Sequence, residues 1–433
     1  MKNKLFENML NANLKSLNFR FCLIFYLSFI LSVVFLSIYF TNSLITKYPG
    51  LVDKDYNIIL KQIPFAHGQL IHNLFYENSY YLNDWNITMY AARLPFVPYL
   101  ISSIFSLFQN IYYFLVLKNI IFFSIYFLGS YIFVSTLNLK IWHFLSFLCL
   151  ILYNPYNLIV SLNFVYADFV VALLLPSFYL IIISEFKHKF ILSAIILFVL
   201  YLTKVNMFFL TIFLSLFIFF IENKKYKIFP IIFVFSAVLI WGGFSFNKTQ
   251  RFAFGSGLIS INSWGLSHVL NKDFKNYYPD KTVDRIVNEK TLKKMNFNDE
   301  WEFYDFYQKQ NYQYIKSNYK EFLSNILLKA KFIFTYIYVD GSQVFITDNK
   351  KEIRYSNIPN KLILNISILL LFLKIFRKRK TLNIEKYDFY YLLILLFYLA
   401  PLLVGWATSK HLIGIFLVSK IYTFITLAKL KKE

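Results

Sequence analysis

The sequence predicts an all-α polytopic membrane protein, and its composition and hydropathy pattern are the observations behind that prediction. Of its 433 residues, 58% are hydrophobic, and the mean hydropathy is +0.51. About ten apolar stretches are long enough to cross a bilayer, because a hydrocarbon core of ~30 Å needs roughly 20 apolar residues per helix. The stretches are too continuous for barrel strands. Helices that satisfy their own backbone in lipid are therefore expected.

The large positive charge fits membrane topology better than nucleic-acid binding. The formal net charge is +22, and the cationic residues gather at the ends of the apolar stretches. This distribution is typical of membrane proteins, whose cytoplasmic loops carry an excess of Lys and Arg. We therefore expect membrane lipids as partners and no nucleic acid.

Charge also decides how many stretches cross the membrane. The stretch 94–108 is short and carries Pro95 in its first turn, where proline is tolerated. If it crossed, the basic clusters around Lys140, Lys187 and Lys224 would move outside, against the positive-inside rule. We therefore expect it to dip into the outer leaflet. Ten spans with both termini in the cytoplasm remain: 20–41, 112–136, 141–155, 168–184, 190–204, 206–222, 228–246, 360–376, 389–405 and 411–428.

Two long polar segments interrupt the spans and would face the outside. They divide the chain into an N-terminal membrane module (1–246) that contains the first external loop (42–111), a second external region (247–357) and C-terminal membrane helices (358–433). Within the second region, apolar residues at helical spacing predict a helix over 301–338 whose end is amphipathic and lies on the membrane surface. Short external turns are expected at 156–168 and 406–410.

Three carboxylates lie at the predicted outer boundary. Asp53 and Asp55 follow the first span, where a carboxylate could act as a general base or hold a metal against a phosphate, although Asp is also common in turns. Asp168 opens the fourth span in an apolar stretch. It could hold a divalent metal ion (Mg, Mn or Zn) or cap its helix.

Five further residues complete the candidate site for substrate or phosphate. Lys204 lies between two spans on the outer side, where it could snorkel to the interface or pair with a phosphate. Lys410 and His411 precede the last span on the same face, although a lone His there can be structural. Arg93 precedes the dipping helix, and Tyr166 stands two residues before the fourth span.

The order of these residues resembles the integral-membrane C-type glycosyltransferases, the GT-C fold, which use polyprenyl-phosphate-linked sugars. The branch that it resembles contains bacterial dolichyl-phosphate-mannose-protein-mannosyltransferase-like proteins and aminoarabinose transferases. Similar positions hold an acidic pair after span one (Asp53-Lys54-Asp55-Tyr56), an Arg with a proline-spaced helix (Arg93 to Leu100), a polar pair (Lys118-Asn119), Asn154-Pro155, Asp168, Lys204 and Lys410-His411. The family often has Arg where this chain has Lys204 and Lys410, and Lys lacks the bidentate fork of Arg.

The resemblance implies a glycosyltransferase of the cell inner membrane with its active face in the periplasm. The donor would be a polyprenyl-phosphate-linked sugar, and the acceptor a glycan, a lipid or a protein. Asp53 or Asp55 would deprotonate the acceptor. Lys204, Lys410, His411 or a metal ion held partly by Asp168 would stabilise the leaving phosphate. The resemblance also implies a single displacement that inverts the anomeric centre.

Two other classes of protein share parts of this pattern. A lipid-linked-sugar flippase or transporter would place its charges along a central water path and would not depend on its outer loops. An O-antigen polymerase-like enzyme would carry arginines in its outer loops rather than an acidic residue directly after span one. The transferase hypothesis expects Asp53 or Asp55 within ~10 Å of Asp168 in one cavity, a distance that a substrate or a metal can bridge.

Overall fold

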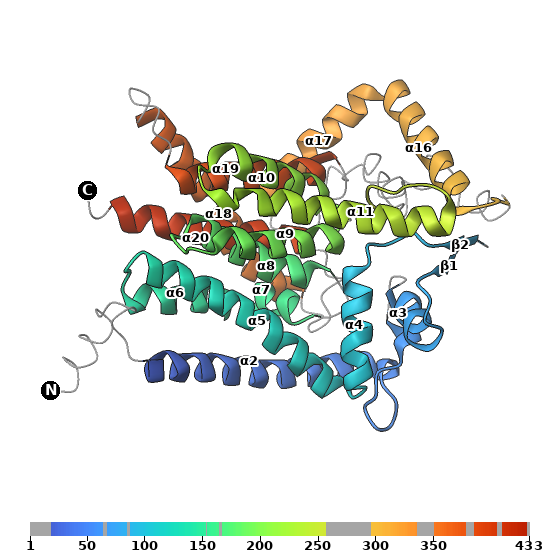
Figure 1. Cartoon of the computed structure of the whole chain (residues 1–433), viewed down its shortest axis with the longest axis horizontal. Coiled ribbons are helices and arrows are strands. Elements are labelled where there is room, and N and C mark those ends of the chain that lie inside the picture. The colour runs from blue at the N-terminus through green and yellow to red at the C-terminus, as the bar shows by residue number, and fades with distance from the viewer. Residues whose placement is uncertain are drawn as a thin grey trace.

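The structure, a computed structural model, is a helical membrane protein with one small hairpin (Figure 1). It describes residues 19–63, 67–84, 87–152, 154–163, 167–256, 296–335, 350–377, 385–404 and 409–430. The prediction of an all-α membrane class is confirmed. Of the sequence-predicted site residues, Tyr166 and the side chain of Lys410 lie outside this part of the chain.

The helices follow one another with short connections through most of the chain. In order they are α2 (Phe19–Lys47), α3 (His67–Tyr76), α4 (Phe96–Leu107), α5 (Ile111–Thr136), α6 (Ile141–Leu152), α7 (Pro155–Leu162), α8 (Asp168–Ile183), α9 (Lys189–Thr203), α10 (Met207–Ile221), α11 (Phe229–Thr249), α16 (Glu300–Ser317), α17 (Tyr319–Phe334), α18 (Lys350–Arg377), α19 (Lys386–Val404) and α20 (Ile413–Leu430). Short 3₁₀ turns are η2 (Pro49–Leu51), η3 (Leu60–Gln62), η4 (Lys225–Ile228) and η6 (Ser409–Leu412). The hairpin pairs β1 (Leu82–Asp84) with β2 (Ile87–Met89) in antiparallel register.

Five helices of the described chain are long and apolar enough to cross a membrane: Arg20–Lys47, Ile111–Thr136, Lys225–Thr249, Ile358–Phe376 and Lys386–Val404. Each coincides with a predicted span. The other five predicted spans fall on apolar helices of 10–17 residues, as does the predicted dipping helix at Phe96–Leu107. On α2, Leu31 and Phe35 are 67% and 71% exposed, as expected for side chains that face lipid rather than water.

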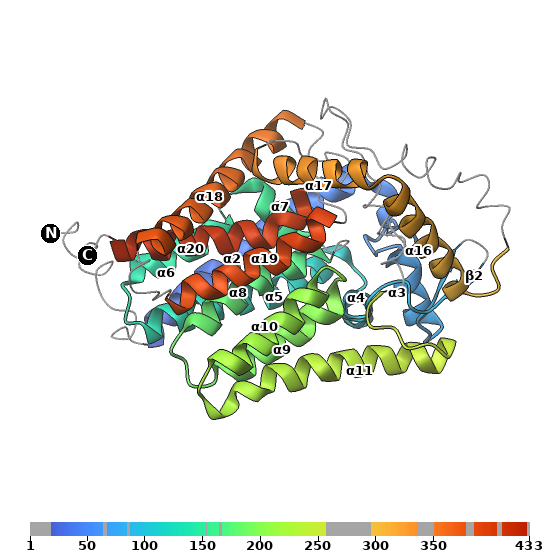
Figure 2. The same cartoon turned by 90° about the horizontal axis from the view of Figure 1, so that it is seen from above.

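The long helices lie side by side, and their two ends differ (Figures 1 and 2). Helix α2 begins and α20 ends at one end, called here the proximal end. The opposite, distal end carries α3, α4, the β1–β2 hairpin and α16. Helix α4 runs across the direction of α2 and α5 in Figure 1, which agrees with a helix that does not cross the membrane.

Two predicted elements differ from the observed ones. The stretch 301–338, expected as one helix, forms α16 and α17 with a break at Asn318, whose φ of −127° is not helical. The turn expected at 156–168 contains α7 instead. Asn154 caps α7 by accepting a hydrogen bond from the Asn157 backbone N–H at 3.1 Å, and Pro155 occupies its first turn, where proline suits a helix start.

Buried lysines satisfy the last carbonyl groups of helices α7 and α8. Lys118 of α5 is fully buried and donates to the Leu162 and Asn163 carbonyls at 2.9 Å each, at the end of α7. Lys189 donates to the carbonyls of Ile182 and Ser184 at 3.1 and 2.9 Å, at the end of α8. The last carbonyls of a helix have no partner within it and carry partial negative charge. A lysine at this position therefore supplies both hydrogen-bond donors and a positive charge to these carbonyl groups.

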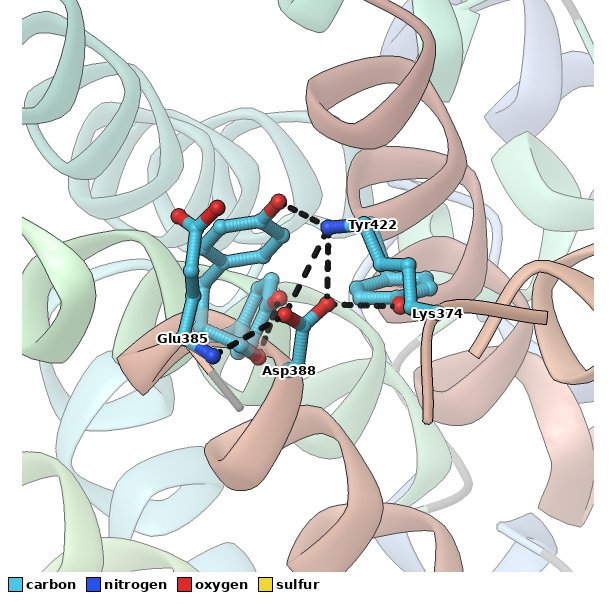
Figure 3. A network of polar contacts seen from close by, with 6 residues as sticks. Lys374, Glu385, Asp388 and Tyr422 are labelled. Atoms are coloured by element: carbon cyan, nitrogen blue, oxygen red, sulfur yellow. Dashed lines mark hydrogen bonds and ion pairs between the residues drawn. The ribbon is translucent and has the colours of Figure 1, made fainter. Parts of the chain in front are cut away.

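A second polar cluster joins α18, α19 and α20 near the proximal end (Figure 3). The Asp388 carboxylate lies 3.1 Å from the Lys374 ammonium and accepts a hydrogen bond from the Tyr422 hydroxyl at 2.8 Å. The Asp388 and Lys374 side chains are 4% and 17% exposed. The sequence reading did not single out this cluster, although an Asp inside an apolar helix is a signal for a buried partner.

Replacing Asp388 with Ala is expected to destabilise the protein strongly, because Lys374 is left buried without its carboxylate. Removing one partner of a buried pair costs about 3–5 kcal/mol. The matched control is Asp305→Ala, which breaks the Arg251–Asp305 pair, 50% exposed on both sides; exposed pairs contribute about 0–1 kcal/mol. The readout is the midpoint of thermal unfolding in detergent. Equal midpoints for the two variants would contradict the structural role of the cluster.

Candidate functional site at the distal end

Asp168 and Lys204 form a buried ion pair between the start of α8 and the end of α9. Their side chains are 6% and 17% exposed. Asp168 is the first residue of α8, and the cap position belongs to Ala167, which makes no side-chain capping bond. Lys204 is the residue that follows α9. An acidic group at a helix start and a basic group at a helix end both suit the helix dipole.

The start of α20 packs against the same end of α8. The Tyr398 hydroxyl donates to the backbone carbonyl of His411, and Tyr398 also interacts electrostatically with Asp168. A Cβ on Gly414 would lie 3.0 Å from Val171 Cγ1, a contact that forces its neighbour to move. Glycine therefore lets α20 approach α8 closely. The structure brings Asp168, Lys204 and the His411 backbone together.

Arg93 lies just before α4 and has no acidic partner in the described chain. Its Nε is sealed from solvent and makes no hydrogen bond. Its carbonyl accepts a hydrogen bond from the Tyr80 hydroxyl at 2.8 Å, and Tyr304 is near enough to interact with its charge. The Tyr80 ring stacks on Tyr99 at 5.8 Å between centroids and meets Trp241 edge-on at 6.2 Å. Burial lowers the pKa of Arg93, as it does for any cation without a counter-ion.

A chain of contacts connects the Arg93 neighbourhood to the end of α9. The Trp241 indole donates to the carbonyl of Gly255 at 2.9 Å. The Tyr201 hydroxyl donates to the carbonyl of Phe254, the residue before Gly255. Tyr201 lies in the last turn of α9, three residues before Lys204. Arg93 and Lys204 thus belong to one region of the distal end.

Asp53 and Asp55 differ in what their carboxylates do. Asp53 accepts hydrogen bonds from the backbone N–H groups of Asp55 and Asn57 at 2.9 and 2.8 Å, and from the Asn57 amide at 3.1 Å. These bonds, those from Asn57 first, lower the pKa of Asp53 and fix the turn between η2 and η3. No such bond involves the Asp55 carboxylate, which is exposed, among the described residues.

The helix α4 separates this turn from Arg93. The Asp55 carbonyl accepts a hydrogen bond from the Asn110 amide at 3.2 Å, just after α4, whereas Arg93 lies just before it. Helix α4 has 12 residues, and a rise of 1.5 Å per residue makes it about 18 Å long. The acidic turn and Arg93 therefore attach to opposite ends of one rigid element.

Glu300 joins the two large distal segments, and the sequence reading missed it. Its carboxylate accepts hydrogen bonds from the backbone N–H groups of Tyr90 and Ala91, each at 3.0 Å, and from the Tyr304 hydroxyl at 3.2 Å. Burial raises the pKa of Glu300, and the hydrogen bonds from Tyr90 and Ala91 oppose that shift. A Glu in the first turn of a helix is readable from sequence, but a partner 210 positions away is not. We call this contact the Glu300 clasp.

The surroundings of Asp168 do not match a metal site. No group of three His, Cys, Asp or Glu side chains that could hold a metal occurs in the described ranges. The Asp168 carboxylate faces the Lys204 ammonium, and a second cation beside that ammonium would be repelled. A metal ion at Asp168 stays a prediction.

Replacing Glu300 with Ala is expected to release the first distal segment from α16. The buried N–H of Ala91 and the half-buried N–H of Tyr90 lose their acceptor, at up to about 1–3 kcal/mol each. Amide hydrogen exchange at Tyr90 and Ala91 should accelerate by roughly 10- to 100-fold, since 1.4 kcal/mol corresponds to a factor of ten. The control is Glu302→Ala, which removes bonds only to Asn298, four residues away. Unchanged exchange at Tyr90 in Glu300→Ala would contradict the clasp.

A scan against models of known families, a search of curated proteins and a search of solved structures each gave no match. The resemblance to the C-type glycosyltransferases therefore rests on the order of residues in the sequence and stays a prediction.

Proposed function

We propose that the protein is an inverting membrane glycosyltransferase with ten spans, whose distal end faces the periplasm. It transfers a sugar from a polyprenyl-phosphate donor to a glycan, lipid or protein acceptor. Support comes from the two large segments, which meet at the distal end through the Glu300 clasp. A transferase needs segments that cover the reacting sugar on one side of the membrane, because water must be excluded from it.

The observation that carries the proposal is the Arg93 side chain, which is half-buried and whose sealed Nε has no hydrogen-bond partner. Leaving a desolvated cationic group without a partner is costly, and an anionic ligand would remove that cost. A phosphate matches the planar fork of Arg, which forms two parallel hydrogen bonds with it. The Tyr99 ring beside it is 46% exposed and offers an aromatic surface for a sugar or a prenyl chain.

Lys204 is the second cation that binds the same phosphate. An ammonium group carries three N–H donors, and the contact with Asp168 uses one of them. Asp168 acts as a positioning residue that holds the ammonium at the end of α9. Lys410 and His411, which precede α20, are the further candidates for phosphate contact.

In the reaction, a carboxylate of the acidic turn takes the proton of the acceptor hydroxyl as its oxygen attacks the anomeric carbon. The bond from that carbon to the phosphate oxygen breaks, and the phosphate leaves with the electron pair. Arg93 and Lys204 stabilise the charge that develops there. Because α4 separates the turn from Arg93, the turn between η2 and η3 must approach the donor when substrates bind, a closure of a kind common in enzymes.

Asp55 suits the role of general base better than Asp53. The lowered pKa of Asp53 makes it a weaker base, and its oxygens already accept three hydrogen bonds that hold the turn. The Asp55 carboxylate is exposed beside it. Asp53 is therefore assigned the role of shaping the turn that presents Asp55.

The test is the initial rate of sugar transfer from a panel of short-chain polyprenyl-phosphate sugars in detergent. Asp55→Asn should lower kcat by about 10²- to 10⁴-fold, the usual contribution of a general base, and Asp53→Asn should lower it less. Arg93→Gln should raise KM for the donor more than Arg93→Lys does. Thermal unfolding controls for loss of folding in each variant.

Other results would change the residue assigned as general base or the proposed class of function. Loss of turnover in Asp168→Asn alone, with folding retained, would make Asp168 the base. Absence of turnover with every donor, together with movement of a labelled lipid-linked sugar across proteoliposomes, would favour the flippase alternative. Chain elongation of a lipid-linked oligosaccharide would favour the O-antigen polymerase-like alternative.

A further inference from the structure

The middle of helix α17 buries two polar side chains and exposes two leucines, the reverse of the pattern on a water-soluble surface. Asn325 and Lys329 are buried at 2% and 1% exposure. Leu323 and Leu327, one turn apart on the outward face, are 53% and 71% exposed. Water outside α17 would leave this apolar face unburied, whereas lipid would cover it.

The C-terminal end of α17 contacts α18 inside its candidate span. The Asn365 amide donates to the carbonyl of Phe334, the last residue of α17, at 2.7 Å. Asn365 is seven residues inside the candidate span Ile358–Phe376, and at 1.5 Å per residue this is about 10 Å along the helix. Lys329 also donates to the carbonyl of Val404, the last residue of α19, at 3.2 Å. Figure 2 shows α17 beside α18 at this flank.

The apolar face of α17 continues the lipid-facing surface of α18 and is bordered by lysines. On α18, Leu362 and Leu369 are each 58% exposed. The exposed lysines Lys316 and Lys320 border the face at its N-terminal end, and the exposed Lys331 lies one turn beyond Leu327. Lysine stems can lie along apolar surface while the ammonium groups reach the phosphates of lipid headgroups.

We propose that α17 is seated in the distal leaflet of the bilayer, with its outward face on phospholipid acyl chains. Leu323 and Leu327 contact the chains, and the bordering lysines bind the anionic headgroup phosphates. The helix enters the leaflet at a slant, because its end at Phe334 is held inside the span of α18. This membrane contact does not depend on the proposed sugar transfer.

The test is the depth of nitroxide labels in lipid nanodiscs that contain anionic phospholipid. Cys22 and Cys149, the two native cysteines, are first replaced by Ser. Single cysteines are then introduced as Lys320→Cys, Leu323→Cys and Leu327→Cys. Relaxation by oxygen, which concentrates in acyl chains, is compared with relaxation by a water-soluble nickel chelate. The control is Tyr312→Cys on α16, where the side chain is 67% exposed.

The ratio of relaxation by oxygen to relaxation by the nickel chelate is expected to rise from position 320 to 323 and again to 327. It is expected to stay low at position 312. Ratios at 323 and 327 as low as at 312 would show water on this face and overturn the proposal. Protection of both labels from both reagents would show a covering protein and overturn it as well. All four labelled positions are exposed, so folding is expected to survive, and thermal unfolding checks it.

Discussion

Most of this structure depends on how helix ends are satisfied where water is scarce. A helix that stops within or near the bilayer leaves carbonyl groups without partners, and lipid offers none. The chain uses the same solution three times: Lys118 at the end of α7, Lys189 at the end of α8 and Lys329 at the end of α19. Each lysine comes from another helix or from the following turn. Each contact therefore fixes the position of two segments as well as satisfying the carbonyl groups.

This use of charge explains why Arg93 stands apart. Lys118, Lys189 and Lys329 have carbonyl partners, and Lys204 and Lys374 have carboxylate partners. Asn154 and Asn157, at the start of α7, meet Asn360 through their amide groups. Arg93 differs, because its Nε is sealed from solvent without a partner among the described residues. An anionic ligand would supply that partner.

The class of the protein and its helices could be predicted from sequence because hydropathy acts locally. Helices occur at all ten predicted spans, and α4 occurs at the predicted dipping stretch. The break at Asn318 was missed because apolar residues recur at helical spacing on both sides of it. Helix α7 was missed because it is short. Partners such as Glu300 with Tyr90, or Asp168 with Lys204, depend on packing between distant segments, which single-sequence periodicity does not record. The contrast between Asp53 and Asp55 needed the turn geometry, since both are acidic residues in the same loop.

The Glu300 clasp also has a consequence for how the chain is made. The backbone N–H groups that it satisfies belong to residues 210 positions earlier in the sequence. At a synthesis rate of about 5–20 residues per second, the first distal segment waits roughly 10 to 40 s for its partner. During that interval helices α5 to α11 enter the membrane while Tyr90 and Ala91 keep water as their acceptor. The distal end therefore cannot complete its fold segment by segment as the chain emerges. Its assembly is a late event in the biogenesis of the protein.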